Sequence, residues 1–424
     1  MRKLFLLITI VIFLPDARAQ ETKTIDTLST RVLIERIEKL EALIAEKEQE
    51  DELETLLQEA SNLGSKEKKK EVDISKKFSS GVRQQQGLNP NLSVLGDFFG
   101  SYTSESTDLV NEPSDYTHGS NGVFMRSLEL SFVAPLDPFA RGKAFLDITE
   151  EGVAIEELYM ELLNLPLNTS LKGGVFFPEF GLLNRHHTHA LPQFDRPRAA
   201  VNYFGLDGFN GMGAAANFML PSLLFSDAAS LDLSAVNIFD NMSYSSDKAV
   251  NMAYVAHFKN YYDLSDASYF EITLSAMAGN NPDLASGNNY IGNLGLHYKW
   301  QPPGLAKYKS LDIKSEFYYS LFEMPGGLVR NKGFYALFHR KLDSRFWLGG
   351  RIGYSEIPGD DGNEWDYTLN LDFWQSEFVF YRIQYQYNGR TMLNYPMVAA
   401  GVPSGHTIVM QFSWAMGPHK HDAY

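Results

Sequence analysis

Three histidines lie within four residues of one polar stretch, "NRHHTHALPQFDRPR", which runs from Asn184 to Arg198. Imidazole is a common zinc ligand, and His187 and His189 could share one metal ion through their i, i+2 spacing. The stretch contains no Glu, and Pro192 and Pro197 exclude the helix on which a zinc hydrolase would carry an H-E-x-x-H motif. The pattern therefore favours a polar loop over a catalytic site, with metal capture as the alternative.

Three other stretches resemble functional motifs only superficially. "GFNGMGAAA", from Gly208 to Ala216, contains G-x-G-x-x-A, but a dinucleotide site needs a helix after it, and "NFMLPS" ends any helix almost at once. The acidic stretch 358–364 matches no EF-hand spacing and is expected to be a hairpin loop. His419 and His421 fall in a tail after the last apolar segment. Because the chain has no G-x-S-x-G motif and no convincing Ser/His/Asp set, we predict that it is not an enzyme.

The first twenty residues have the pattern of a secretory signal peptide. Arg2 and Lys3 precede an apolar stretch from Leu4 to Leu14, and the small residues of Ala17-Arg18-Ala19 end the segment before Gln20. The apolar stretch is too short for a stable membrane anchor. We therefore assign residues 1–19 to a signal peptide.

The composition excludes several classes of protein. The chain has no Cys, so thiolate metal sites, disulfides and a lipid-anchored N-terminal Cys are excluded. A formal net charge of -15 argues against nucleic-acid binding. After the signal peptide no run of 18 apolar residues occurs, which excludes a transmembrane helix. With 22 Tyr and 29 Phe, the remaining class to test is a transmembrane β-barrel.

A helical segment is expected before the strands, at residues 28–63. Apolar residues recur there at the four-three-four spacing of a coiled-coil seam, at Leu33, Ile37, Leu40 and Ile44. The segment is a short oligomerising coil or a lone amphipathic helix. The lysine-rich residues 64–90 are expected to form a charged, flexible linker.

From Leu92 onward the apolar pattern changes to the alternation of β-strands. In "LDIKSEFYYSL", Leu311, Ile313 and Phe317 share one face, while Asp312 and Lys314 lie on the other. The segments run to roughly ten residues, aromatic residues gather at their ends, and short connections alternate with long ones, as in an outer-membrane barrel. We predict an all-β transmembrane barrel of about sixteen antiparallel strands over residues 91–424, wide enough to hold water.

The alternation also predicts where the strands begin. The expected starts lie near residues 92, 123, 141, 154, 169, 211, 230, 250, 268, 290, 311, 332, 346, 365, 378 and 406.

The inward face and the third external loop, at roughly 178–208, define the predicted pore. The pore lining is predicted to include Glu157, Glu161, Lys172, Asp312, Lys314, Glu316, Arg351 and Arg382. The loop is predicted to fold inward and to narrow the pore with His186, His187, His189, Asp195, Arg196 and Arg198. Because acidic residues outnumber basic ones on the inward face, we expect a mild preference for cations.

A family resemblance is carried by residues 127–197. The stretch "GVFFPEFGLLNRHHTH" has the pattern GxFFxxFGxLN followed by H-x-H, at positions Phe176, Phe177, Phe180, Gly181, Asn184, His187 and His189. It resembles a family of bacterial outer-membrane proteins labelled zinc-regulated TonB-dependent outer-membrane receptors, which are related in shape to phosphate-selective-type porins. The resemblance extends over roughly residues 90–220. It implies an outer-membrane barrel linked to metal supply.

One part of the family label does not suit this chain. TonB-dependent receptors have a plugged, 22-stranded barrel. Residues 20–90, between the expected signal peptide and the first strand, have the pattern of a helix and a linker, which leaves no room for a plug domain. We therefore expect a channel without a plug.

These patterns together predict a porin-like channel in the outer membrane of a Gram-negative bacterium, with its N-terminal helix in the periplasm. Small hydrophilic solutes or ions, metal ions among them, would diffuse through it. The expected partners are outer-membrane lipid, these solutes and two further copies of the chain in a homotrimer, with no nucleic acid. No cofactor is expected beyond transient Zn²⁺ at His187 and His189. The alternatives are a plugless substrate-specific receptor and a structural envelope protein tethered through its coiled coil.

Overall fold

The computed structural model describes residues 90–104, 121–149, 152–238, 243–244, 252–281, 287–356, 362–391 and 404–417. The expected signal peptide, helix and C-terminal tail lie outside these ranges, as do all but the last residue of the expected linker and most of the stretch 358–364. No helix within the described ranges is long and apolar enough to cross a membrane.

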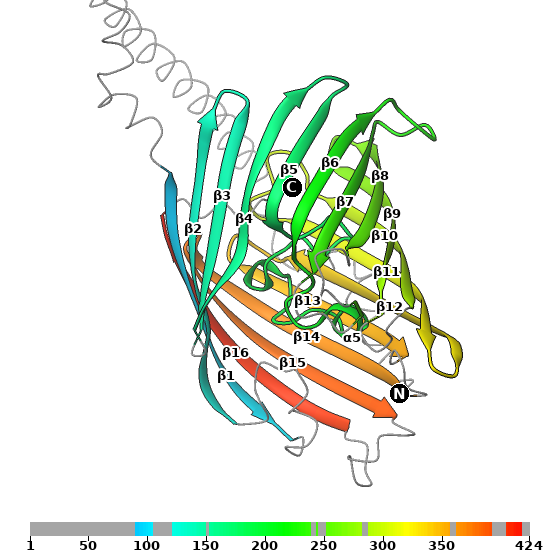
Figure 1. Ribbon diagram of the computed structural model, residues 1–424. Helices are drawn as coiled ribbons and strands as arrows, with labels where there is room; N and C mark the ends of the chain where they lie inside the picture. The colour runs from blue at the N-terminus through cyan, green and yellow to red at the C-terminus, as the bar shows by residue number, and fades with distance from the viewer. Residues whose placement is uncertain are drawn as a thin grey trace, which may run out of the picture. The chain divides into compact units, whose positions relative to one another are not determined.

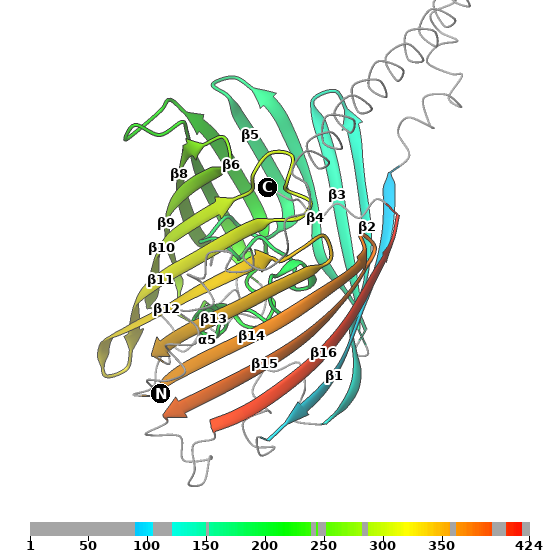
Figure 2. The same cartoon turned by 180° about the vertical axis from the view of Figure 1, so that it is seen from behind.

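In the described part of the chain, sixteen strands form one closed antiparallel barrel (Figure 1, and from behind in Figure 2). The strands are β1 (Asn91–Thr103), β2 (Gly122–Asp137), β3 (Ala140–Thr149), β4 (Gly152–Leu165), β5 (Thr169–Phe176), β6 (Gly211–Leu220), β7 (Ala228–Ile238), β8 (Ala253–Ser265), β9 (Ser268–Asn280), β10 (Asn288–Trp300), β11 (Ser310–Met324), β12 (Gly327–Lys341), β13 (Phe346–Glu356), β14 (Asn363–Ser376), β15 (Val379–Thr391) and β16 (Ser404–Met416). Each strand pairs with its sequence neighbours, and β1 closes the sheet against β16. The predicted fold class is confirmed.

The predicted strand starts agree with the structure to within about three residues, with one exception. The twelfth strand was expected near residue 332, but β12 begins at Gly327. It follows β11 after a tight turn at 325–326, and the pairing continues to Met324↔Gly327. The polar run Arg330, Asn331 and Lys332 at the start of β12 hides the alternation, which is why the sequence placed this strand too late.

The two faces of the sheet have opposite character. On β15, Tyr381, Ile383 and Tyr385 are exposed on the outer face, whereas Arg382 and Gln384 are buried on the inner face. An apolar outer face is what hydrocarbon requires, and a polar inner face is what a water-filled or polar interior requires. Closure satisfies the backbone hydrogen bonds of every strand, so that no edge is left open to lipid.

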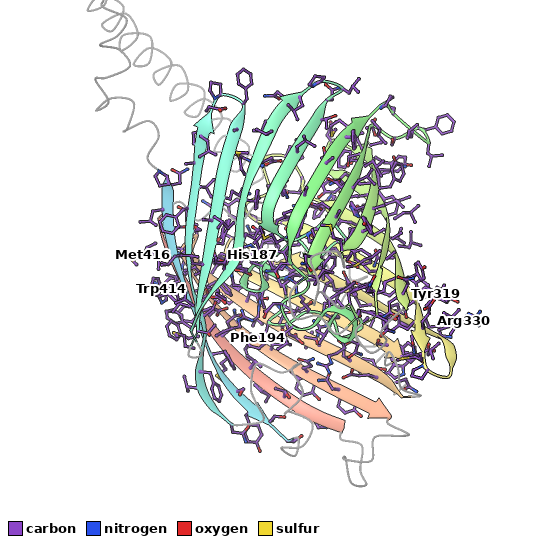
Figure 3. All side chains as sticks on the ribbon, viewed as in Figure 1. His187, Phe194, Tyr319, Arg330, Trp414 and Met416 are labelled. Carbon is purple, nitrogen blue, oxygen red and sulfur yellow. The ribbon has the colours of Figure 1, made fainter. Side chains whose placement is uncertain are left out.

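The connection between β5 and β6, residues 177–210, runs into the barrel, where Figure 3 labels two of its residues, His187 and Phe194. We call it the inward loop. It contains a short 3₁₀ turn at Thr188–Ala190 and the helix α5 at Arg198–Phe204, which packs against β12, β13 and β14 inside the barrel (Figure 1). The expectation that prolines exclude a helix is thus wrong for the end of the loop. Pro197 precedes the first helical residue, a position where proline is tolerated, and the histidines stay outside the α-helix.

Aromatic side chains attach the inward loop to the wall. Tyr203 of α5 stacks on Tyr318 of β11 with ring centroids 5.7 Å apart, and Phe204 contacts Phe180 and Phe209 within the loop. These residues belong to the largest buried apolar cluster in the described ranges, which therefore lies inside the barrel between loop and wall.

The two faces of the sheet generate a prediction about membrane stability. Leu369 lies at the middle of β14 with half of its side chain exposed on the outer face. We predict that Leu369→Arg lowers the free energy of unfolding by about 2–4 kcal/mol, because a cation there has to enter hydrocarbon. The matched control, Leu342→Arg in the turn between β12 and β13, is expected to cost about 0–1 kcal/mol. Denaturant unfolding from lipid vesicles measures both, and equal costs would contradict the assignment of the outer face to lipid.

Candidate functional site

The inward loop is held to the wall by a set of buried arginines, each of which also has an aspartate partner on the wall. Arg351 of β13 donates to Asp366 of β14 at 2.7 Å and to both carboxylate oxygens of Asp195 in the loop at 3.1 and 3.2 Å. Gln384 and Gln386 of β15 donate to the same carboxylate. Asp195, predicted to narrow the pore, is therefore an attachment point of the loop.

Two further arginines bind loop carbonyls in the same way. Arg382 of β15 pairs with Asp372 at 2.9 Å and donates to the carbonyl of Leu191 at 3.2 Å. Arg126 of β2 pairs with Asp97 and donates to the carbonyl of Phe194 at 2.5 Å. Because a buried charge is costly unless it is paired and hydrogen-bonded, each aspartate–arginine pair makes a stable donor for the loop backbone.

On strand β11, two strands from Arg351, a buried glutamate accepts a hydrogen bond from the first part of the loop. Glu316 of β11 accepts hydrogen bonds from the backbone N–H of Leu182 at 2.6 Å and from the hydroxyls of Tyr318 and Tyr335 at 2.5 and 2.7 Å. Gly181, with φ +59°, passes so close that a Cβ would lie 2.4 Å from this carboxylate. Only glycine fits a left-handed conformation at that approach, which explains the glycine in "FGLLN".

The two arginines of the loop itself are also structural. Arg196 is fully buried and donates to the carbonyls of Leu183, His186 and Asp207, so it braces one part of the loop against another. Arg198 pairs with Glu364 of β14 at 2.8 Å. Both were predicted to line a constriction, and in the structure both side chains are buried.

The eight residues predicted to line the pore all lie on the inward side of the sheet, in different surroundings. Glu316, Arg351 and Arg382 are covered by the inward loop. Glu161 pairs with Arg141 at 2.7 Å, and Asp312 lies 3.7 Å from Lys314. Lys172 lies over the rings of Tyr159 and Phe176, and Glu157 faces the histidines.

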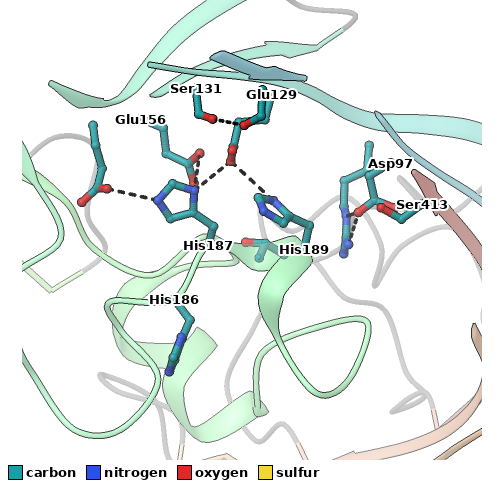
Figure 4. A network of polar contacts seen from close by, with 12 residues as sticks. Asp97, Glu129, Ser131, Glu156, His186, His187, His189 and Ser413 are labelled. Atoms are coloured by element: carbon teal, nitrogen blue, oxygen red, sulfur yellow. Dashed lines mark hydrogen bonds and ion pairs between the residues drawn. The ribbon is translucent and has the colours of Figure 1, made fainter. Parts of the chain in front are cut away.

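The histidines of the loop meet three glutamates of the wall (Figure 4). His187 Nδ1 lies 2.8 Å from Glu129 Oε2 of β2 and 3.2 Å from Glu156 Oε2 of β4, while its Nε2 lies 3.3 Å from Glu157 Oε2. His189 Nδ1 lies 3.5 Å from the same Glu129 oxygen. The structure thus brings the predicted pair of histidines together with carboxylates from two strands. We call these five residues the His–Glu cluster.

His186 does not join the His–Glu cluster. Its ring points away from the glutamates in Figure 4. Burial, with the positive charges of Lys314, Arg185 and Arg196 adding to it, holds the pKa of His186 well below the ordinary histidine value, so this imidazole is neutral.

A β-bulge explains how two consecutive glutamates reach the same histidine. Residues that follow one another in a strand normally point to opposite faces. In the β3–β4 ladder Phe145 pairs with Glu157 and Leu146 with Ile155, so Glu156 is the extra residue of a bulge. The Glu156 carbonyl accepts a hydrogen bond from Asn210 of the loop at 2.9 Å. A second bulge, between β1 and β2, turns Arg126 inward toward Phe194.

Electrostatics in the loop follow from these contacts. Burial disfavours a charged His187, but Glu156, Glu129 and Glu157 outweigh it and raise the pKa of His187 well above the ordinary value. Burial alone would raise the pKa of Asp195, but Arg351, Gln384 and Gln386 stabilise the carboxylate and lower its pKa. The loop therefore meets the wall through opposite charges at two separate places.

Sequence reasoning did not join Glu129 or Glu156 to the histidines. The signal for Glu156 was the pair "EE" at 156–157, because strict alternation would put one of these charges on the lipid face. Among the described residues, Glu129, His187 and His189 form a group whose ligand atoms all lie within 4.8 Å of one another. Such a set of nitrogen and oxygen donors suits a divalent metal ion.

Comparison with known proteins finds few relatives by sequence. No family model matches the chain. An uncharacterized protein of Aquifex aeolicus is 27% identical over 150 residues, which are 32% of this chain and 32% of that protein. The match thus spans about a third of the relative's length.

Solved structures are similar in fold. The anion-selective porin from Comamonas acidovorans aligns with a TM-score of 0.52 and 11% identity, over 77% of this chain and 99% of that chain. OprB of Pseudomonas putida aligns with a TM-score of 0.52 and 9% identity, over 80% and 97%. OmpF of Salmonella typhi, in complex with daunomycin, gives 0.51 and 10%, over 78% and 99%. Identities this low show a shared porin-type barrel fold. The link to metal supply that the family resemblance implies stays a prediction, as does the absence of a plug.

The attachment of the loop generates a prediction about Arg351. Replacing it by methionine leaves Asp195 and Asp366 as buried carboxylates without their cation, a change that costs about 3–5 kcal/mol in comparable pairs. We expect Arg351→Met to release the loop, so that trypsin cleaves after Arg198 much faster than in the wild type. Adding Asp195→Asn and Asp366→Asn should restore part of the protection.

The matched control is the rim pair of Lys332 and Glu356, 3.5 Å apart with the lysine largely exposed. An exposed ion pair contributes about 0–1 kcal/mol, so Lys332→Met should leave cleavage of the loop unchanged. Wild-type protection in Arg351→Met would show that the Asp195 contact does not hold the loop.

Proposed function

We propose that the protein is a porin-like channel of the outer membrane, through which small hydrophilic solutes or ions diffuse, with the inward loop as its constriction. The observation that carries this proposal is the loop itself. It crosses a sixteen-stranded barrel and contacts β2, β11, β13 and β15, so a solute has to pass between the loop and the wall. A barrel of this strand number leaves an aqueous interior when nothing fills it.

The charges near the loop support a preference for cations. The wall arginines Arg126, Arg351 and Arg382 are each neutralised by an aspartate of the wall. The ion pairs of Glu129, Glu156 and Glu157, by contrast, are with histidines of the loop. Three carboxylates against two imidazoles leave an excess of negative charge beside the constriction, and rings of fixed charge set ion preference at close range. Divalent metal ions are accordingly among the solutes that we propose.

A second candidate function is a substrate-specific receptor without a plug. It is favoured by the extent of the loop's burial: Arg196, Tyr203 and Phe209 have almost no exposed surface. A loop fixed this firmly would have to move before a passage opened. The homotrimer and the periplasmic position of the N-terminal helix remain predictions from the sequence.

Single-channel recording tests the constriction. Phe176 and Gly211 are directly paired partners at the ends of β5 and β6, so a two-residue Asn-Gly turn can replace residues 177–210. The wall arginines keep their aspartates in this variant, and the barrel is therefore expected to fold. We predict stepwise openings of the wild type in planar bilayers and a several-fold larger conductance of the variant.

Each result of this experiment decides between the candidates. A variant conductance no larger than that of the wild type would contradict a constriction by the loop. A silent wild type with an open variant would support the receptor, whose passage the loop closes.

The charge excess generates a prediction about selectivity. In the presence of a chelator and a salt gradient, the wild-type reversal potential is expected to indicate a preference for cations. Replacing Glu156 and Glu157 together by Gln should shift it toward anions, because two acidic side chains beside the constriction are removed. Glu356→Gln at the rim is the control and should change the potential little. An anion-selective wild type would overturn this part of the proposal.

A further inference from the structure

We infer that the His–Glu cluster is a resident site for a divalent cation of the zinc class, which fastens the inward loop to β2 and β4. This inference goes beyond transient capture by two histidines, because the wall contributes at least as many ligands as the loop does. His187 and His189 supply imidazole nitrogens, Glu129 and Glu156 supply carboxylate oxygens, and Glu157 orients one imidazole.

Three of the donor groups, Glu129, His187 and His189, lie near the spacing that a tetrahedral ion requires. Zinc binds nitrogen and oxygen at about 2.0–2.2 Å, which puts neighbouring ligand atoms of a tetrahedron about 3.3–3.5 Å apart. His187 Nδ1 lies 2.8 and 3.2 Å from oxygens of Glu129 and Glu156, and His189 Nδ1 lies 3.5 Å from the Glu129 oxygen. The ligand atoms of Glu129, His187 and His189 all lie within 4.8 Å of one another, and Glu156, which lies outside that group, would have to turn further toward the ion to become a fourth ligand. Nitrogen and oxygen donors in this number suit zinc better than calcium or magnesium, which prefer oxygen alone.

An orphaned polar atom points to the same site. Glu129 is 2% exposed, and its second oxygen, Oε1, has no hydrogen-bond partner in the structure. A buried carboxylate oxygen without a partner costs free energy, and an added cation would remove that cost. The neighbouring acidic groups also favour a cation at this site. Asp147 and Asp207 lie close enough to Glu129 and Glu156 for the like charges to disfavour one another.

Glu157 has the position of a residue that supports a metal ligand. With Nδ1 of His187 directed at Glu129 and Glu156, the other ring nitrogen, Nε2, faces Glu157 at 3.3 Å. A metal-bound histidine usually donates its second N–H to a carboxylate, which fixes the orientation of the ring. Phe145 and Phe177 pack against the same ring, with centroids 4.7 and 5.6 Å away, and restrict it further. Glu157 is therefore a positioning residue.

The ion would regulate the constriction, a consequence that rests on the proposed channel function. Elsewhere the loop is held to the wall by Arg351, Arg382 and Arg126. At His187 and His189 it contacts the wall through the His–Glu cluster, where a bound cation would connect the two. Binding of the ion adds a cross-link between the loop and strands β2 and β4. Removal of the ion leaves only the ion pairs of His187 and His189 with the glutamates, so that end of the loop is held less tightly.

Zinc binding can be measured without any assay of transport. The full chain is purified in detergent, stripped with a chelator and titrated with Zn²⁺ against a chromophoric zinc indicator. All proteins carry His419→Ala and His421→Ala, which removes the tail histidines. We expect one Zn²⁺ per chain, a loss of at least about 100-fold in affinity for His187→Ala/His189→Ala, and a loss of about 10–100-fold for Glu157→Gln, as found for residues that support metal ligands.

His186→Ala is the matched control, since it removes a neighbouring imidazole that does not join the cluster, and its zinc affinity should stay within about twofold of the parent.

Co²⁺ in place of zinc reports the coordination geometry of the site. A tetrahedral site gives strong visible absorption, which Glu157→Gln should shift and the double histidine variant should abolish. Unchanged affinity in the double variant would overturn the inference. If that variant fails to fold, as judged by heat-dependent gel mobility, Glu129→Gln is titrated with Zn²⁺ instead. An unchanged zinc affinity of Glu129→Gln would then overturn the inference.

Regulation is tested by recording the wild type before and after addition of the chelator. We expect larger current fluctuations without zinc and no response in His187→Ala/His189→Ala. The two proposals can fail separately. A silent channel that binds zinc overturns only the channel function, and a conducting channel that binds none overturns only the metal site.

Discussion

A strand in hydrocarbon has to find every backbone hydrogen bond within the protein, and the rest of this structure depends on that constraint. Sixteen strands satisfy it by closing β1 onto β16, which removes both edges of the sheet. Closure separates the side chains into a face toward lipid and a face toward the interior. The interior of such a barrel is large enough that polar groups, and even a whole loop, can be placed there.

A similar constraint governs the inward loop, because most of its residues are buried. Its carbonyls at Leu191 and Phe194 accept hydrogen bonds from arginines of the wall, and its N–H at Leu182 donates to Glu316. The arginines remain paired with aspartates whether or not the loop is present, so the wall is a preformed binding surface for it. This arrangement allows a loop to be fixed firmly while the barrel keeps its own stability, which is what a constriction requires.

The His–Glu cluster differs from these attachments because the acidic side chains of the wall outnumber the basic side chains that they meet. At the arginine sites each cation faces an aspartate, whereas here three glutamates face two histidines. The bulge at Glu156 concentrates the negative charge further by turning inward a residue that alternation would send to lipid. Bulges often occur next to functional sites, where they redirect a side chain, and this one directs Glu156 into the cluster. The proposed selectivity and the proposed metal binding both follow from this excess of acidic groups.

The sequence by itself determined the barrel, because alternation with a period of two records which side chains meet lipid, and this pattern placed fifteen of the sixteen strands closely. It also identified the loop and the pair His187 and His189, since crowded imidazoles are visible without a fold. Only the tertiary structure decided what these histidines face. Glu129 lies 58 residues before His187 in the chain, and Glu156 reaches it through a bulge that breaks the periodicity on which sequence reasoning relies. Contacts between distant segments and departures from regular pairing leave no local pattern, so the partners of the loop had to be read from the closed barrel.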